Sequence, residues 1–386
     1  MSMCEWRSDW DKNYRCRVAA EEGSRFCIFH EPGKKDIERF KQAFYSQIRE
    51  EGLPDERNPK YDFRGYVFPT GLAVQGEKAE LILPREIRGD LIMAESAIKG
   101  HALFDDATIE GDAFFEDATI EGLAFFEGFT VKGHAFFEGF TIKGQAFFEG
   151  FTVKGHAFFT HATFEGHADF EAATIEGDAD LEAATFEGDA NFRGTEASAI
   201  YLGERRPTIL WWERNREGVT LKSYFAGVSF WRFARRTFAK MDERERADAA
   251  YYFEKLWQRR SRLASSGREK LMAIAGYPFE VLFLRLPIAY GTSLVRPLMS
   301  WFVMIVLFGG LYAGFPSLIG RTVKSVWTLS NWVISLHFSV TSFTTLGLGD
   351  IRPDRLLGKA LTSIEAVVGG VLMALTVVVI SRKLMR

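Results

Sequence analysis

A seven-residue run near the C-terminal end, Thr344–Asp350 (TTLGLGD), has the residue types that can replace the water around a cation. A dehydrated cation needs oxygen ligands in place of its hydration shell, and rings of backbone carbonyls can supply them. Aiming successive carbonyls in one direction needs unusual backbone angles, which Gly347 and Gly349 tolerate. We therefore expect a cation-binding loop made of main-chain oxygens; the alternative is an ordinary glycine-rich turn between two helices.

The first 33 residues hold a second group with chemical potential, three cysteines and a histidine. Cysteine and histidine suit tetrahedral structural Zn²⁺, and a segment this short needs such a staple because it cannot build a core. Since all the cysteines lie here, a disulfide framework is disfavoured. We expect a structural Zn²⁺ site, the alternative being three reduced thiols and a surface histidine. The expected ligands are Cys4, Cys16, Cys27 and His30.

Two apolar runs flank the glycine-containing loop and would position it. Residues 298–315 carry no charge, and residues 360–380 carry only Glu365. A membrane-spanning helix needs roughly 20 largely apolar residues, so both runs qualify. The segment between them is too short and too polar for a third span, and residues 328–343 read as a short amphipathic helix that leads into the loop.

Two spans that flank a short helix and a T-x-G-x-G-D loop resemble the two-transmembrane potassium-channel family. The resemblance implies K⁺ as the permeating ion and a homotetramer, because one loop makes a quarter of a ring. It assigns support of the filter to Thr344 and Asp350. The residues that it places in the ion-conducting filter are Thr345, Leu346, Gly347, Leu348 and Gly349.

The chain departs from the family pattern around the loop. Many filters of this family have Tyr or Phe at the position of Leu348, and leucine cannot donate a hydrogen bond there. His337 and Thr341 stand in the preceding helix, and His337 is expected either to pair with Asp350 or to pack without a function. Glu365 is an intramembrane carboxylate, and such residues are rarely without a role. Its position predicts bonding behind the filter.

The second apolar run also contains candidates for the moving parts of a channel. Gly369 and Gly370 soften a helix locally and are candidate hinge residues. Val377 and Val378 follow near the expected cytoplasmic mouth, where apolar side chains can close a path by dewetting. We therefore expect an inner gate below a glycine hinge.

Residues 87–194 repeat with a period of 11, which is the sequence signature of a solenoid. The A-x-[FL] and A-T-[IV] units resemble the pentapeptide-repeat family, with one extra residue per pair. The resemblance implies a right-handed, four-sided β-helix with about 22 residues per coil. The large apolar column expected to fill its axis is Phe104, Phe115, Phe126, Phe137, Phe148, Phe159, Phe170, Leu181 and Phe192.

On the outside of such a coil, residues 22 apart should stack about 4.8 Å apart. One outward column is titratable and consists of Asp112, His134, His156 and Asp178. We expect this ladder either to bind a divalent metal, to sense pH or to be a solvated polar face. An apolar outward set of this size normally marks an interface. We expect a neighbouring subunit or the chain's own following helices to meet Phe114, Phe125, Phe136, Phe147 and Phe158.

These elements predict a multidomain α+β membrane protein, with a β-helix followed by linker helices and a channel domain. The expected parts are a zinc-binding segment (1–33), a helix and linker (34–60), the β-helix (61–200), a helical linker (201–272), an interfacial helix (273–296) and a two-span domain (297–386). Within the last part we expect an outer helix (298–315), a pore helix (328–343), the filter (344–350) and an inner helix (360–381).

The formal net charge of −3 hides an uneven distribution, because the repeats are acidic while the following linker and the C-terminal tail are basic. Basic residues at the same side of both spans predict cytoplasmic termini in the plasma membrane. The N-terminal end has no apolar leader, so we expect the large first domain to stay inside the cell.

Together these features favour a passive K⁺ channel in the lipid bilayer over an enzyme. The sequence has no nucleotide-binding loop of the Rossmann or P-loop type, and we expect no nucleic-acid partner and no small-molecule substrate. Two alternatives stay open. One is a non-selective monovalent cation channel, and the other is an acidic solenoid that mimics DNA and binds proteins at the membrane.

Overall fold

The computed structural model divides the chain into an N-terminal unit (residues 1–261) and a C-terminal unit (residues 262–386), each described by itself. The residues that the structure describes are 2–33, 35–50, 61–74, 81–203, 219–285, 287–293, 295–322, 326, 328–345, 351–353 and 355–384.

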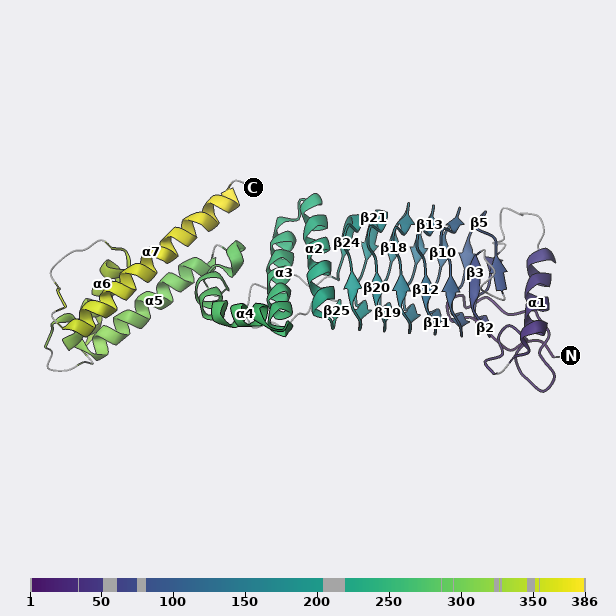
Figure 1. Ribbon diagram of the computed structural model, residues 1–386, viewed down its shortest axis with the longest axis horizontal. Coiled ribbons are helices and arrows are strands. Elements are labelled where there is room, and N and C mark those ends of the chain that lie inside the picture. Colours follow the sequence, from purple (N-terminus) through teal and green to yellow (C-terminus); the bar gives the residue numbers. More distant parts are fainter. Residues whose placement is uncertain are drawn as a thin grey trace. The chain divides into compact units, whose positions relative to one another are not determined.

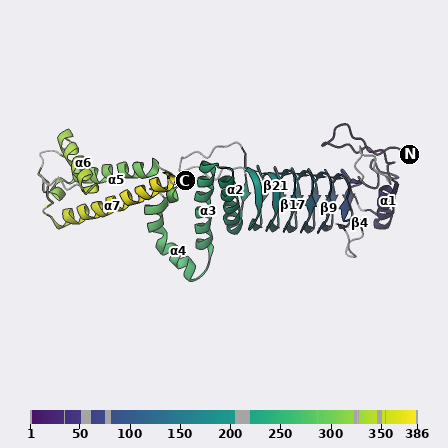
Figure 2. The same cartoon turned by 90° about the horizontal axis from the view of Figure 1, so that it is seen from above.

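A parallel β-solenoid forms the centre of the N-terminal unit (Figures 1 and 2). Most of its strands are two residues long and pair with strands 22 residues away, as Ala113 pairs with Ala135 and Thr119 with Thr141. The predicted 22-residue coil is therefore confirmed. Each coil passes through four walls in turn, and the corresponding strands of successive coils form one ladder per wall.

The walls are named by their strands. Wall 1 contains β1 (Tyr61–Asp62), β6 (Leu91–Ile92), β10 (Ala113–Phe114), β14 (Ala135–Phe136) and β18 (Ala157–Phe158). Wall 2 contains β2 (Val67–Phe68), β7 (Ala97–Ile98), β11 (Thr119–Ile120), β15 (Thr141–Ile142), β19 (Thr163–Phe164), β22 (Thr185–Phe186) and β25 (Thr220–Leu221). Wall 3 contains β3 (Leu72–Val74), β4 (Leu81–Leu83), β8 (Ala102–Leu103), β12 (Ala124–Phe125), β16 (Ala146–Phe147), β20 (Ala168–Asp169) and β23 (Ala190–Asn191). Wall 4 contains β5 (Glu86–Ile87), β9 (Thr108–Ile109), β13 (Thr130–Val131) and β17 (Thr152–Val153), and β21 (Thr174–Asp180) and β24 (Glu196–Tyr201) run from wall 4 into wall 1.

The solenoid core is a stack of phenylalanine rings. Phe104, Phe126 and Phe148 stack with centroids 5.3 and 4.8 Å apart. Offset stacking of this kind adds to the free energy gained by burying the rings. The column predicted to fill the axis is buried throughout: Phe104, Phe115, Phe126, Phe137, Phe148, Phe159, Phe170, Leu181 and Phe192.

Helices close both ends of this core. At the N-terminal end, α1 (Ile37–Glu50) places Phe44 5.3 Å from Phe63 of the first coil. At the other end, α2 (Tyr224–Lys240) stacks Phe233 on Phe192, with ring centroids 5.7 Å apart. The strongly apolar ends of the stack are thereby removed from water.

Helix α3 (Arg244–Ala264) packs on α2 and completes this end of the unit. A Cβ at Gly227 would lie 2.2 Å from the ring of Trp257, so the two helices approach closely only because this residue is glycine. The carboxylate of Glu254 pairs with Arg232 and Arg235 of α2, both at 3.2 Å.

The outward phenylalanines lie on two opposite walls, so the expectation of a single apolar patch is wrong. Phe114, Phe136 and Phe158 stack on wall 1 with centroids 4.9 and 5.1 Å apart. Phe125 and Phe147 stack on wall 3 at 4.9 Å. The reason is geometric: a period of 11 is half a coil, so alternate members fall on alternate walls. The following helix α2 packs against the last coil, at β23, β24 and β25.

The C-terminal unit is helical. Its elements are α4 (Arg268–Phe279), the π-helical turn η1 (Glu280–Arg285), the 3₁₀ turns η2 (Ala289–Gly291) and η3 (Pro316–Ile319), α5 (Val295–Gly314), α6 (Leu329–Phe343) and α7 (Leu356–Leu384). By length and composition, Val295–Gly314 and Leu356–Lys383 can each cross a membrane. Helix α5 begins three residues before the predicted run and ends one residue before its end, whereas α7 extends beyond its predicted run at both ends. Helix α6 packs against α5 and α7.

Candidate functional site: the pore helices and the metal ligands

The predicted filter begins where α6 ends. Thr328 caps the start of this helix, and Thr344 is its C-terminal cap. Thr345 has a φ of 55°, which is unusual for a β-branched residue and marks the turn into the loop. A helix C-terminus carries partial negative charge, which favours a cation beside it. The other predicted filter residues, Leu346–Gly349, and Asp350 lie outside the described residues, so their roles stay predictions.

Glu365 joins α5, α6 and α7 through its hydrogen bonds. Its side chain is fully buried, and its Oε2 accepts a hydrogen bond from the Tyr312 hydroxyl at 2.8 Å. Its Oε1 accepts a hydrogen bond from the Ser339 hydroxyl. A buried carboxylate is costly unless hydrogen bonds compensate it, and here the donors come from α5 and α6 while the acceptor belongs to α7. Inspection of the sequence missed Tyr312 and Ser339, although each is a polar residue in a largely apolar helix.

Gly369 provides a close contact between α7 and the end of α6. A Cβ at this position would lie 2.2 Å from the carbonyl oxygen of Phe343. By contrast, among the residues that the structure describes, a Cβ placed at Gly370 would meet nothing within 4 Å outside the backbone of its own helix. The two candidate hinge residues therefore have different environments inside one uninterrupted helix, and only Gly369 is required for packing within the chain.

The remaining predicted residues of this unit are spread over two helices. Thr341 is buried, and its hydroxyl donates to the carbonyl of Phe338 at 2.9 Å. His337 is exposed in the single chain, and its expected partner Asp350 lies outside the described residues. Val377 and Val378 are 61% and 62% exposed, so the chain itself does not cover the face of α7 expected to form a gate.

The four predicted metal ligands converge at the N-terminal end of the chain. Cys4, Cys16, Cys27 and His30 are all buried, and their ligand atoms lie within 4.8 Å of one another. The sulfurs of Cys16 and Cys27 are 3.8 Å apart, and Cys4 Sγ is 3.6 Å from His30 Nδ1. Tetrahedral Zn²⁺ with bonds of about 2.3 Å to sulfur and about 2.0 Å to nitrogen would separate two sulfurs by about 3.8 Å and a sulfur from a nitrogen by about 3.5 Å. The sulfur of Cys27 lies closer than this to His30 Nδ1, at 3.1 Å, and separations within the set extend up to 4.8 Å, so the donor set fits this metal after small shifts of the side chains.

The surroundings of these ligands also favour a metal. His30 Nε2 donates to the carbonyl of Arg64 at 3.1 Å, which leaves Nδ1 for the ion and fixes the ring. The hydrogen bond between Cys16 and Cys27 lowers the pKa of Cys27 and raises that of Cys16, so two sulfurs share a proton that a metal would displace. Arg64 belongs to the first coil, and the ligands are thereby joined to the solenoid.

The Asp–His column stacks along one corner of the solenoid. The rings of His134 and His156 are parallel with centroids 5.2 Å apart. Asp112 Oδ1 accepts from the backbone N–H of His134 at 2.6 Å, His134 Nδ1 from that of His156 at 3.0 Å, and His156 Nδ1 from that of Asp178 at 2.9 Å. Each side chain thus satisfies a main-chain donor of the next coil. The sensor role of this ladder stays a prediction.

Two parts of the chain match known protein families. Residues 300–386 match the model described as ion channel, and residues 148–196 match the model described as pentapeptide repeats, with 9 copies. No curated protein and no solved structure matches the chain. The first match contains residues 300–314 of α5 together with α6 and α7, and the second covers about two coils of the solenoid. The chain is therefore a membrane protein that joins a pentapeptide-repeat β-solenoid to a C-terminal ion-channel domain.

Proposed function

We propose that the chain is one subunit of a homotetrameric channel that conducts K⁺ passively across the plasma membrane, with both termini in the cytoplasm. The observation that carries the proposal is the ion-channel match over residues 300–386, in which α6 ends at Phe343 and lies in the sequence between two helices able to span a membrane. Four copies of residues 344–350 would surround one axis, and their carbonyl oxygens would replace the hydration shell of the ion.

The roles proposed for single residues follow from this arrangement. Thr345, Leu346, Gly347 and Leu348 would present oxygens to K⁺, and Asp350 would brace the outer mouth. Glu365 would hold the pore helix in place, because its hydrogen bonds reach both α5 and α6. Val377 and Val378 would face the path below Gly370, where bending of α7 could open and close it.

Reversal potentials with K⁺ on one side of the membrane and Na⁺ on the other test this proposal. A K⁺-selective filter predicts a potential far from zero and its loss in Gly347→Ala, because a side chain there hinders the backbone angles that the filter needs. Gly276→Ala is the control, since a Cβ there would meet nothing within 4 Å outside its own helix backbone among the described residues. Selective currents that persist in Gly347→Ala would contradict the assignment of the filter.

A non-selective cation channel is the second candidate, because Leu348 stands where an aromatic hydrogen-bond donor would hold the filter firmly. The same recordings separate the two, since a non-selective pore reverses near zero with equal K⁺ and Na⁺.

We also infer that Zn²⁺ binds Cys4, Cys16, Cys27 and His30. All four tetrahedral positions would be taken by protein ligands, which is typical of structural rather than catalytic zinc. The ion would tie the first 30 residues to the first coil of the solenoid through His30 and Arg64.

A further inference from the structure

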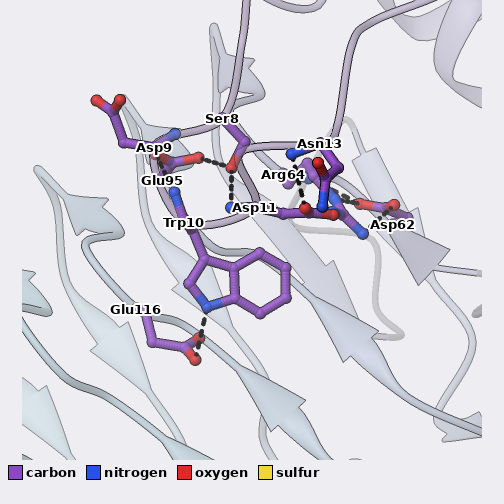
Figure 3. A network of polar contacts seen from close by, with 9 residues as sticks. All are labelled: Ser8, Asp9, Trp10, Asp11, Asn13, Asp62, Arg64, Glu95 and Glu116. Atoms are coloured by element: carbon purple, nitrogen blue, oxygen red, sulfur yellow. Dashed lines mark hydrogen bonds and ion pairs between the residues drawn. The ribbon is translucent and has the colours of Figure 1, made fainter.

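Trp10 occupies a small aromatic and acidic site on wall 1 of the solenoid (Figure 3). Its ring lies 5.5 Å from that of Phe114, and its Nε1–H donates to Glu116 Oε1 at 3.1 Å. Glu95 of the preceding coil accepts from the backbone N–H of Trp10, also at 3.1 Å. The strap formed by residues 8–11 is thus held by side chains of two successive coils.

The repeat places the same pair of side chains one coil further along the wall. Phe136 stacks on Phe114 with centroids 4.9 Å apart, and Glu138 follows Phe136 as Glu116 follows Phe114. Glu116 is only 8% exposed. Among the described residues, nothing donates to Oε2 of Glu116 or to Oε2 of Glu138, although both atoms are buried. Burial raises the pKa of both carboxyl groups. A buried carboxylate oxygen without a donor is costly, so rotation of the partly exposed Glu138 side chain towards a ligand that brings a donor would be favourable.

Wall 3, on the opposite side of the solenoid, does not have such buried glutamate oxygens among its described residues. Phe125 and Phe147 form the equivalent stack on wall 3, and Glu127 and Glu149 follow their strands as Glu138 follows β14. Both of these carboxylates are exposed, so water can satisfy them. Wall 3 therefore has the same residue types without the buried oxygens, and it provides a matched control within the same chain.

Charge restricts what could dock on wall 1. The three segments that carry the stripe, residues 112–118, 134–140 and 156–162, contain no lysine or arginine; acidic residues lie in the first two segments and histidines in the last two. At the site of Trp10 the positive charge comes from Arg64, whose guanidinium lies 5.1 Å from the indole ring. No arginine or lysine occupies the corresponding place beside Phe136 in these segments. A ligand there must supply its own cation, and a basic residue next to an aromatic ring would do so.

We propose that Phe136 and Glu138 form a binding site for a tryptophan flanked by basic residues in a segment of another protein. The indole ring lies on Phe136, its N–H donates to the carboxylate of Glu138, and the neighbouring basic side chain meets the acidic wall. The strap sets the edge of the site, because Trp10 already covers Phe114.

A short peptide with one 5-fluorotryptophan between two arginines tests the site on the full-length protein in lipid nanodiscs. Fluorine NMR reports only the probe, so the chain's own tryptophans do not interfere. Replacement of Glu138 by Met should weaken binding about tenfold, the size expected for losing one hydrogen bond to a charged group. Replacement of Phe136 by Ser should weaken it by about the same factor, because the contact between two aromatic rings is lost. Phe147→Ser and Glu149→Met on wall 3 should leave binding unchanged.

A second probe isolates the hydrogen bond. The same peptide with a methyl group on the indole nitrogen cannot donate, and it should bind about tenfold more weakly to the wild-type protein. The outward position of Phe136 and Glu138 allows these variants to fold, which their thermal unfolding can verify against the wild type.

Three results would overturn the proposal. The first is equal loss of binding in the wall 1 and wall 3 variants, and the second is equal affinity for the two peptides. The third concerns Trp211 and Trp212, which lie outside the described residues. If replacing both with Ser tightened peptide binding, this chain itself would be the natural occupant of the site rather than another protein.

Discussion

Two buried glutamates, Glu116 in the solenoid and Glu365 between the membrane helices, hold segments that are far apart in the sequence. Glu116 accepts from Trp10, and Glu365 accepts from Tyr312 and Ser339. Removing a carboxylate from water is unfavourable, so both positions depend on the donors that face them. Their substitution should therefore have effects that a surface glutamate would not show.

The pKa of Glu116 predicts a pH dependence for the N-terminal unit. Burial raises this pKa from 4.5 to about 7 in the folded protein. The folded state binds the proton of Glu116 more tightly than the unfolded state does, so protonation of Glu116 stabilises the folded protein. This stabilisation is complete below pH 4.5 and is lost as the pH rises towards 7. The free energy of unfolding should fall by on the order of 2 kcal/mol over this range. Thermal unfolding of the full chain between pH 5.5 and 8 measures it.

In Glu116→Gln this component of the pH dependence should disappear. Glu110→Gln is the control, because Glu110 is exposed and paired with Lys132 at 2.7 Å. A wild-type pH profile retained by Glu116→Gln would show that another group titrates.

Tyr312→Phe should destabilise the channel unit and alter its currents. The substitution removes only the hydroxyl that donates to Glu365 at 2.8 Å, and an unsatisfied buried carboxylate oxygen costs about 1–3 kcal/mol. We expect lower thermal stability of the purified assembly and altered open times in single-channel recordings. Ser363→Ala is the control, because that exposed hydroxyl bonds only the Lys359 carbonyl of its own helix among the described contacts. Unchanged stability and open times in Tyr312→Phe would exclude this role.

Among the elements, α7 contains two neighbouring glycines that the sequence alone could not distinguish. Gly369 faces the end of α6, while a Cβ at Gly370 would meet no side chain within 4 Å in the described part of the chain. The sequence supports a flexible helix at both positions, but close approach to a backbone carbonyl depends on the packing of α6. The same limit applies to Tyr312, Ser339 and Trp10, because their partners lie 26 to 106 residues away.

Gly369→Ala should disrupt the contact between α6 and α7. The added methyl group would lie 2.2 Å from the Phe343 carbonyl oxygen, and overpacking of this kind costs about 1–3 kcal/mol. Gly370→Ala should be tolerated and should favour the helix by about 1 kcal/mol. Thermal stability and reversal potentials of the two variants measure the difference, and equal behaviour would contradict the packing role of Gly369.

Local patterns predicted other elements well. Thr328 caps α6 as its position before an apolar helix suggests, and the period of 11 gave the 22-residue coil directly. The period also predicts that the outward phenylalanines divide between two walls. Residues 11 apart are separated by half a coil, so they lie on opposite walls. The buried oxygens of Glu116 and Glu138 could not be foreseen, because Glu127 and Glu149 have the same local sequence and are exposed.

At the scale of the whole molecule, the metal ligands and the solenoid should fold together. Chelation of zinc, or Cys16→Ser, should lower the free energy of unfolding of the N-terminal unit by more than about 3 kcal/mol, because the ion would join separate segments of the first 30 residues. Elemental analysis should find one zinc per chain in the wild type. Ser2→Ala, an exposed substitution in the same segment, is the control. Purified chains without zinc, or a stability indifferent to chelator, would contradict the structural site.

The 22-residue register also limits how the gene for such a chain can change in length. Tandem duplication of a single 11-residue unit would turn every later coil by half a revolution and move the departure of α2 to the opposite side of the stack. Duplication of two units restores the orientation and lengthens the stack by about 4.8 Å. The distance between the metal-binding end and the helical end can therefore evolve only in such increments, with the N-terminal strap and α2 keeping their mutual orientation.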